Sequence, residues 1–243
     1  MHIAPLHCGS VMRRLRLPWI NKRATYFIVM VLAGACAHAQ SSPAACGPLE
    51  NAFGPYDYRP EKFRSVPGDP MPFAAKRNLV DGAHFTTEVE NLIRGKGGPI
   101  GGDIDYTLRA WPNHHRALLS MKRYGERLKV DQVPYAKYSV ECYFVRAISF
   151  ARDDLIVRML YAGFLNERKR KTEAMSQLEV VKRNVGDNPF TAYNLGLMYA
   201  DLGAYDEALE AAHLAIAFGF PRMDLKERLV KAGKWSDPAR SPE

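Results

Sequence analysis

Residues 189–222 read PFTAYNLGLMYADLGAYDEALEAAHLAIAFGFPR, and a weaker copy of the same pattern directly precedes them. The pair Glu207 and Ala208 lies 34 residues after the pair Glu173 and Ala174. A fixed period of this length is typical of proteins built from repeated pairs of helices. The sequence therefore predicts stacked helical hairpins in this part of the chain.

Small and large residues both stand at fixed positions of the unit 189–222. Counted from its first residue, Leu195 and Gly196 are at positions 7 and 8, Tyr199 is at position 11 and Ala208 is at position 20. Small side chains let two antiparallel helices approach closely, while large neighbours fill the remaining space. The pattern resembles the tetratricopeptide repeat (TPR). This resemblance implies an all-α fold made of helical hairpins.

The preceding unit, residues 155–188, matches the repeat less closely. Tyr161 and Ala162 stand where the Leu-Gly pair is expected, and Ala174 is at position 20. Residues 155–188 and 189–222 are therefore predicted to be the second and third TPR.

A degenerate first TPR is predicted over residues 106–154. Its first helix is expected in PNHHRALLSMKRYGERL and its second helix in YSVECYFVRAISFARDD. The loop between them, about residues 129–137, is longer than in a standard repeat and contains Pro134, which favours a loop.

A C-terminal capping helix is predicted within residues 223–236. The segment MDLKERLVKAGKW places Leu225, Leu229 and Val230 on one side and charged residues on another. Repeat arrays need such an end with a polar outer face. Gly233 is expected to end this helix.

Residues 40–105 form an N-terminal segment rich in Pro and Gly, in which we expect one short helix. That helix lies in TTEVENLIRG, where Thr87 and Glu90 form a capping box and Gly95 ends the helix. The following GKGGPIGGD is expected to be a flexible or tightly turning loop. Four aromatic side chains are expected to pack on the helical body: Phe53, Tyr56, Tyr58 and Phe63.

Three stretches resemble a group of bacterial exported TPR proteins: CGPLENAFGPYDYR, HFTTEVENLIRGKGG and DYTLRAWPNHHRAL. Members of this group are often labelled as ABC transporter permeases. One short apolar run cannot build a membrane pore, so that label does not suit this chain. The resemblance implies no particular chemistry.

A cleavable signal peptide is predicted over residues 1–39. A basic region precedes the apolar run YFIVMVLAGACAHA, which is shorter than the roughly 20 residues of a spanning helix. The run ends in an A-x-A pattern, so we expect cleavage after Ala39 and a periplasmic or secreted protein without stable membrane insertion. An uncleaved membrane anchor is the alternative, and translation starts at Met1 or at Met12.

The net charge of +8 is concentrated at the N-terminus. Residues 1–39 hold five basic residues and no acidic one, and the remaining chain has 29 basic against 26 acidic residues. Nucleic-acid binding needs a basic face on the folded domain. We therefore expect no nucleic-acid partner.

Cys46 and Cys142 are the two cysteines that remain after the predicted cleavage. In an oxidising compartment such a pair is expected to form a disulfide. The alternative is two buried free thiols.

His114 and His115 are adjacent, so on a helix they point about 100° apart and are poorly placed to share one metal ion. The simplest interpretation is a helix start with one packed and one exposed histidine. A metal site for Zn²⁺ or Mn²⁺ is the alternative, if the Gly-rich loop folds back and brings together four residues: His84, Asp103, Asp105 and His114.

No catalytic motif is present, so we expect neither an enzyme nor a cofactor.

In the resembling repeats, first-helix residues line a groove that binds a partner. The corresponding residues here are Ile156, Met159, Gly163, Asn166 and Glu167 in the second repeat, and Phe190, Tyr193, Asn194, Leu197, Ala200 and Asp201 in the third. This surface is apolar, which favours an apolar peptide as ligand or coverage by the N-terminal segment.

We expect an exported scaffold or adaptor that binds a protein or peptide in the bacterial cell envelope. A periplasmic metal-dependent enzyme or metal-binding protein is the alternative, and the sequence assigns no oligomeric state.

Overall fold

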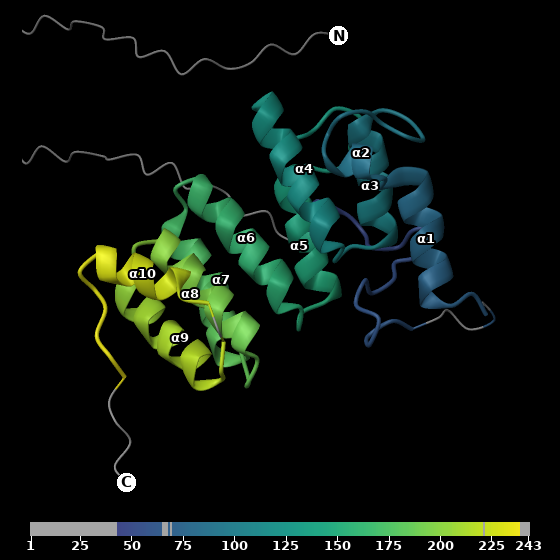
Figure 1. Cartoon of the computed structure of the whole chain (residues 1–243). Helices are drawn as coiled ribbons and strands as arrows, with labels where there is room; N and C mark the ends of the chain where they lie inside the picture. Colours follow the sequence, from purple (N-terminus) through teal and green to yellow (C-terminus); the bar gives the residue numbers. More distant parts are fainter. Residues whose placement is uncertain (1–42, 65–67, 69, 221, 239–243) are drawn as a thin grey trace, which may run out of the picture. The chain divides into compact units, whose positions relative to one another are not determined.

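A computed structural model describes residues 43–64, 68, 70–220 and 222–238 of the 243-residue chain. Within these residues all regular structure is helical, which confirms the predicted all-α class (Figure 1). The elements are η1 (Pro43–Cys46), α1 (Phe73–His84), α2 (Thr87–Glu90), α3 (Ile100–Ala110), α4 (His115–Leu128), α5 (Val140–Phe150), α6 (Leu155–Glu167), α7 (Lys171–Arg183), α8 (Pro189–Asp201), α9 (Tyr205–Ala217) and α10 (Asp224–Lys231).

The predicted signal peptide and its cleavage after Ala39 lie outside the described residues, as do both candidate start codons. The described residues all belong to one compact unit. None of the described helices has the length and apolar character that crossing a bilayer requires.

Two antiparallel hairpins occupy the units 155–188 and 189–222, as the 34-residue period predicted: α6 with α7, and α8 with α9. Gly196 shows why a small residue is needed at its position. A Cβ there would lie 2.4 Å from Cδ2 of Leu225 and 3.3 Å from Cβ of Ala211. The close approach of α8 to α9 and α10 therefore depends on this glycine.

The turns of these two hairpins repeat with the same period. Lys169 and Gly203 are 34 residues apart, and both have left-handed backbone conformations, with φ of 61° and 68°. The following residue in each turn donates its N–H to a carbonyl of the first helix, from Arg170 to Leu165 and from Ala204 to Tyr199, both at 2.9 Å. The turns of the two units thus have equivalent backbone structures.

The first hairpin consists of α4 and α5, with a long connection between them, as predicted for residues 106–154. Two details differ from the expectation. Residues 106–110 belong to α3, and α4 begins at His115 instead of at Pro112 because the side chain of His114 caps it.

The expectation of one short helix in residues 40–105 is wrong, because α1 and α3 also begin there. Helix α3 starts within the Gly-rich stretch that we expected to be a loop. A Cβ on Gly101 would lie 2.1 Å from the carbonyl oxygen of Pro134, so this glycine permits close helix packing. Sequence alone cannot distinguish that role from flexibility.

The predicted capping box at Thr87 and Glu90 is also not formed. Helix α2 ends at Glu90, and its N-cap residue is Thr86, whose side chain makes no capping hydrogen bond. Glu90 instead accepts hydrogen bonds from Arg116, from Nε at 2.7 Å and also from Nη2. The carboxylate is thus used in a tertiary contact between α2 and α4.

The aromatic residues of the N-terminal segment pack around Trp111, as expected. The ring centroids of Tyr56, Tyr58 and Phe63 lie 5.2, 6.0 and 6.0 Å from that of Trp111. Phe53 contacts Tyr56 at 5.3 Å. The segment therefore has its own apolar cluster against the end of α3.

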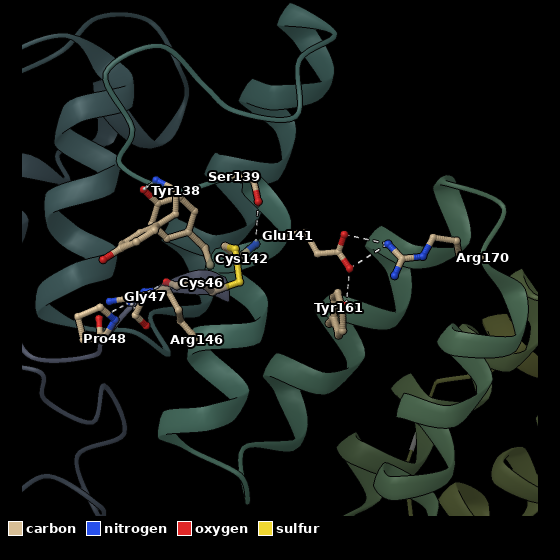
Figure 2. Close-up of a disulfide and its surroundings, with 11 residues drawn as sticks. Cys46, Gly47, Pro48, Tyr138, Ser139, Glu141, Cys142, Arg146, Tyr161 and Arg170 are labelled. Atoms are coloured by element: carbon tan, nitrogen blue, oxygen red, sulfur yellow. Dashed lines mark hydrogen bonds and ion pairs between the residues drawn. A yellow bond between two sulfur atoms is a disulfide. The ribbon is translucent and has the colours of Figure 1, made fainter. Parts of the chain in front are cut away.

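Cys46 and Cys142 form the predicted disulfide, with their Cα atoms 5.1 Å apart (Figure 2). The bond joins η1 to α5. The guanidinium of Arg146 supports the same junction by donating to the carbonyl oxygens of Cys46 and Gly47, each at 3.2 Å, and of Pro48. The start of the N-terminal segment is thereby fixed to the first hairpin.

Helix α10 covers the end of the third hairpin, as predicted for residues 223–236. Leu225 and Leu229 are buried, whereas Val230, which we placed on the same side, is exposed. The apolar stripe of α10 is therefore narrower than expected.

Candidate binding groove

The first helices of the three hairpins, α4, α6 and α8, lie side by side and run in the same direction. At their beginnings, Nε2 of His115 is 2.9 Å from Oδ2 of Asp154, the N-cap residue of α6. At their ends, Nδ2 of Asn166 donates to the carbonyl oxygen of Asp201 at 3.4 Å. Their C-terminal ends therefore gather on one side of the molecule.

A cavity of about 390 Å³ opens between these helices. The predicted groove residues that line it are Ile156, Met159, Gly163, Glu167, Phe190, Asn194 and Leu197. Helix α4 contributes Leu119 and Lys122. We call this cavity and its continuation toward the ends of the helices the groove.

The continuation is a second cavity of about 290 Å³. It shares Gly163, Glu167 and Met198 with the first cavity and adds Asn166 and Asp201. The groove thus runs from an apolar end at the beginnings of α6 and α8 to a polar end at their last residues.

Tyr193 and Ala200 are predicted groove residues that the structure places outside the groove lining. The side chain of Tyr193 is buried, and its ring centroid lies 4.6 Å from that of Phe220, which follows α9. The chain after α9 folds over this side of α8, so Tyr193 faces its own hairpin and not the groove. Ala200 is likewise buried and is absent from the lining of the groove.

The apolar end of the groove exposes large side chains to water. Phe190 is 58% exposed and Ile156 is 41% exposed, while Met159 lies deeper. Coverage by the N-terminal segment was one expected explanation of this apolar surface. In the part of the chain that the structure describes, no residue before 119 lines the groove, so the described N-terminal segment does not cover it.

The polar end carries two glutamates around one lysine. Nζ of Lys122 lies 2.6 Å from Oε1 of Glu167 and 3.2 Å from Oε1 of Glu126. Burial raises the pKa of Glu167, and the hydrogen bond with Glu126 raises it further. Burial also raises the pKa of Glu126, but hydrogen bonds with Glu167 and Lys122 outweigh it, and this pKa is lower than usual.

Lys122 and Glu126 were not among the predicted site residues. The long loop after α4 breaks the 34-residue register, so the repeat positions could not be transferred to this helix. Starting the count at the first residue of α4 would have found Glu126 but not Lys122, and only the structure locates that first residue.

The metal-site alternative required four residues to converge, and the structure brings only two of them together. Nδ1 of His84 is 2.9 Å from Oδ1 of Asp103. Asp103 also accepts backbone N–H groups of the Gly-rich loop, from Lys96 at 2.6 Å and from Gly97 at 3.1 Å. The loop does fold back, and its N–H groups bind this carboxylate.

The other two candidates have separate partners. Asp105 accepts hydrogen bonds from Arg109 at 2.9 Å and from Lys137 N–H at 3.1 Å, and also from the hydroxyl of Tyr143. Over the described residues, no group of three or more His, Cys, Asp or Glu side chains is placed to hold a metal ion. The four-residue metal site is therefore not formed.

His114 is fully buried and has a structural role. Its Nδ1 accepts the backbone N–H of Ala117 at 3.1 Å, and its ring stacks on Tyr58 with centroids 3.8 Å apart. Nε2 lies 3.5 Å from Oδ1 of Asp81. Burial lowers the pKa of His114 more strongly than Asp81 raises it, so the folded structure favours the neutral ring.

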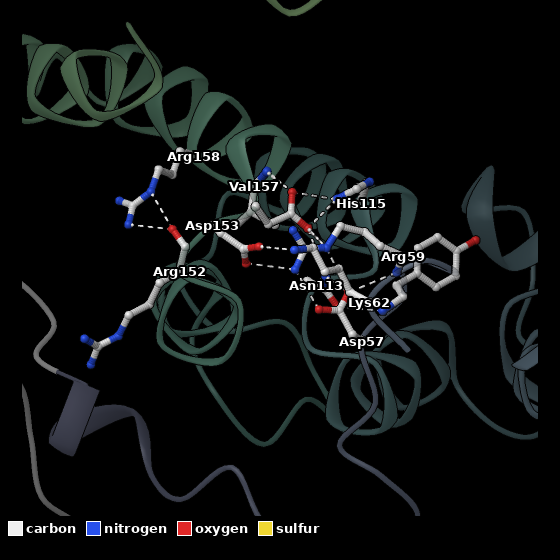
Figure 3. Close-up of polar contacts among 11 residues, drawn as sticks. Asp57, Arg59, Lys62, Asn113, His115, Arg152, Asp153, Val157 and Arg158 are labelled. Atoms are coloured by element: carbon white, nitrogen blue, oxygen red, sulfur yellow. Dashed lines mark hydrogen bonds and ion pairs between the residues drawn. The ribbon is translucent and has the colours of Figure 1, made fainter. Parts of the chain in front are cut away.

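His115 belongs to a buried polar cluster at the start of α6 (Figure 3). Asp154 caps α6 and also accepts a hydrogen bond from Asn113 at 2.9 Å. Burial raises the pKa of Asp154, but its hydrogen bonds, led by that from His115, lower it below the usual value. Arg59, in the N-terminal segment, pairs with Asp57 of the same segment at 2.7 Å and with Asp153, next to Asp154, at 2.9 Å, and so ties the segment to this cluster.

The comparisons with known proteins give no relative for this chain. No protein-family model, no curated protein and no solved structure matches it. The family resemblance of the repeats therefore stays a prediction from the sequence.

Proposed function

We propose that this chain is an exported TPR scaffold or adaptor that binds a protein or peptide in the bacterial cell envelope, without catalysing a reaction. The observation that carries this proposal is the groove between α4, α6 and α8, where Ile156 and Phe190 present apolar surface to water. Burying such side chains against a partner is favourable by about 25 cal/mol per Å² of apolar area.

Two further observations support the repeat and the export parts of the proposal. Lys169 and Gly203 occupy equivalent turns one repeat length apart. The disulfide between Cys46 and Cys142 suits an oxidising compartment, which the signal-like residues 1–39 also predict. Mass spectrometry of the exported chain tests the predicted export, and the expected first residue of that chain is Gln40.

The proposed binding of a protein or peptide is tested by affinity capture from an envelope extract, with one variant in the groove and one matched variant outside it. Phe190→Ala removes an exposed groove side chain, and Val230→Ala, on α10, removes an exposed apolar side chain outside the groove. We expect the captured proteins to be depleted with Phe190→Ala and retained with Val230→Ala. Equal capture by both variants and the unchanged chain would contradict a groove-dependent function.

No observation favours the metal-dependent alternative, because His84 and Asp103 lie together but Asp105 and His114 have other partners.

A further inference from the structure

We propose that the groove takes a peptide segment with an apolar side chain at the Phe190 end and a cationic side chain, lysine or arginine, at the Glu167 end. This inference rests on the proposed function, because it names the chemistry of the partner.

The direction of the three parallel helices gives the polar end a negative potential. The C-terminal end of a helix carries a partial negative charge, because its last carbonyl groups have no partners within the helix. Helices α6 and α8 each end on a carboxylate, Glu167 and Asp201, and neither has a basic residue in its last turn. Glu126, in the last turn of α4, adds a third carboxylate to the same end.

The cations of the chain neutralise this end only in part. Lys122 is shared by Glu126 and Glu167, and Arg228 pairs with Asp201 at 2.7 Å. In the lining of the groove itself, the carboxylates of Glu167 and Asp201 outnumber the one cation, Lys122, which Glu126 also shares.

The neighbouring arginines have other direct partners, although the charge of Arg168 also lowers the pKa of Glu126. Arg127 donates to the carbonyl oxygen of Leu92 at 2.9 Å, and Arg168 lies over the ring of Phe164 at 3.7 Å. A cationic side chain of the partner beside Glu167 would therefore offset the excess of carboxylates in the groove lining.

Exposure places that cation beside Glu167. The side chain of Glu167 is 50% exposed and lines both parts of the groove, whereas that of Lys122 is 12% exposed. A ligand in the groove can therefore reach the outer side of the Glu167 carboxylate while Lys122 holds the inner side.

The opposite end of the groove is apolar. Ile156 and Phe190 are the second residues of α6 and α8, and Leu119 and Leu197 continue the apolar lining. From Ile156 to Glu167 a helix rises about 16 Å, a distance that an extended peptide covers with about five residues. The apolar and cationic side chains of the partner are expected to be no farther apart than this.

An anionic ligand group does not suit the polar end. A C-terminal carboxylate or a phosphate there would face Glu167 and Asp201, and like charges in an interface oppose binding. The charge pattern thus selects a cationic partner segment.

The experiment is a selection from a random peptide library on the purified, disulfide-bonded chain, followed by affinity measurements with a selected peptide. The variants are Glu167→Gln and Phe190→Ala in the groove. The matched controls are Glu210→Gln on α9, an exposed glutamate paired with Lys182, and Val230→Ala on α10. Thermal unfolding of each variant confirms that it folds.

We expect selected peptides to carry an aromatic or aliphatic residue and a lysine or arginine within about five residues of each other. Glu167→Gln should weaken binding about two- to fivefold, as expected for a partly exposed ion pair, and added salt should reduce the difference. Phe190→Ala should weaken binding about tenfold, and the two controls should bind like the unchanged chain.

Two negative results are distinguishable. If no peptide is enriched over the uncoated surface, the proposed peptide-binding function fails and this inference fails with it. If peptides bind and depend on Phe190, but lack basic residues or bind Glu167→Gln as tightly as the unchanged chain, the cationic requirement alone is overturned.

Discussion

Lys169 has a left-handed backbone with φ of 61°, at the turn position that Gly203 occupies one repeat later. In this region the Cβ of an L-residue comes close to the following carbonyl oxygen, at a cost of roughly 1–2 kcal/mol, which glycine avoids. Glycine also makes the unfolded chain more flexible, which offsets part of that gain.

Lys169→Gly is therefore expected to raise the free energy of unfolding by about 0.5–1 kcal/mol. Gly203→Ala, the opposite change at the equivalent turn, is expected to lower it by a similar amount. Urea unfolding followed by circular dichroism measures both. A loss of stability in Lys169→Gly would show that the lysine side chain stabilises the turn in a way that its backbone conformation does not indicate.

His114 predicts a pH dependence of stability. Burial lowers its pKa in the folded protein below the ordinary value of 6.5, so the unfolded chain binds this proton more readily. The stability that the neutral ring contributes is complete above pH 6.5 and is lost as the pH falls toward the lowered pKa.

Between about pH 7.5 and pH 5.5, the unchanged chain is expected to lose more stability than His114→Asn, which keeps a side-chain acceptor for the helix cap. His213→Asn, at a partly exposed histidine, should behave like the unchanged chain. Unfolding curves over this pH range give the comparison. If the free energy of unfolding depended on pH in the same way in all three proteins, the pH dependence would not come from His114.

At the scale of elements, helices α6 to α9 could be predicted because their information is local. The small residues Gly196 and Ala208 recur with the repeat and mark where two neighbouring helices meet. Helices α1 and α3 could not be predicted, since distant contacts stabilise them. Buried Lys76 in α1 lies over the ring of Tyr56 at 4.7 Å, although lysine is normally a surface residue.

The residues of the groove were also predicted only in part. Its residues in α6 and α8 follow from their repeat positions, but those in α4 do not, because the long loop after α4 changes the register. Tyr193 was assigned to the groove in error, because the pattern does not show that Phe220 packs against it.

Helix α3 offers a pair of adjacent glycines with opposite expected effects. A Cβ on Gly101 would meet the carbonyl oxygen of Pro134 at 2.1 Å, whereas a Cβ on Gly102 would lie 3.6 Å from Cβ of Tyr135, an ordinary contact. The first glycine is required by packing, and the second is not.

We expect Gly101→Ala to destabilise the protein by about 1–3 kcal/mol, because the backbone must move. Gly102→Ala should stabilise it by up to about 1 kcal/mol, because alanine is the better helix former. Denaturant unfolding of the two variants decides the matter. If both variants were stabilised, α3 would not pack against the loop at Pro134 as described.

For the whole molecule, the disulfide connects two regions that lie 96 residues apart in the sequence. In the chain-entropy model, closing such a loop stabilises the folded state by as much as about 4–5 kcal/mol. The bond joins η1 to α5, whereas the hairpins of α6 to α9 lie beyond it in the sequence and depend on it less directly.

A Cys46→Ser and Cys142→Ser double variant should therefore lose protection from hydrogen exchange first in residues 43–64. Residues 155–217 should keep most of theirs near neutral pH. Mass spectrometry of exchanging amides measures both regions, and thiol titration of the unreduced, denatured chain provides the control. Two titratable thiols in the otherwise unchanged chain that begins at Gln40, whose two cysteines are Cys46 and Cys142, or an equal loss of protection in both regions, would contradict this account.

The central claim is that the groove between α4, α6 and α8 is the surface through which this chain meets its partner. The most direct measurement is photo-cross-linking in living cells, with benzoylphenylalanine at position 190 in the groove and, separately, at position 230 on α10. Both positions are exposed, so the label should leave the fold intact. The account predicts a discrete cross-linked envelope partner from position 190 and none from position 230. The same partner from both positions, or from position 230 alone, would contradict it.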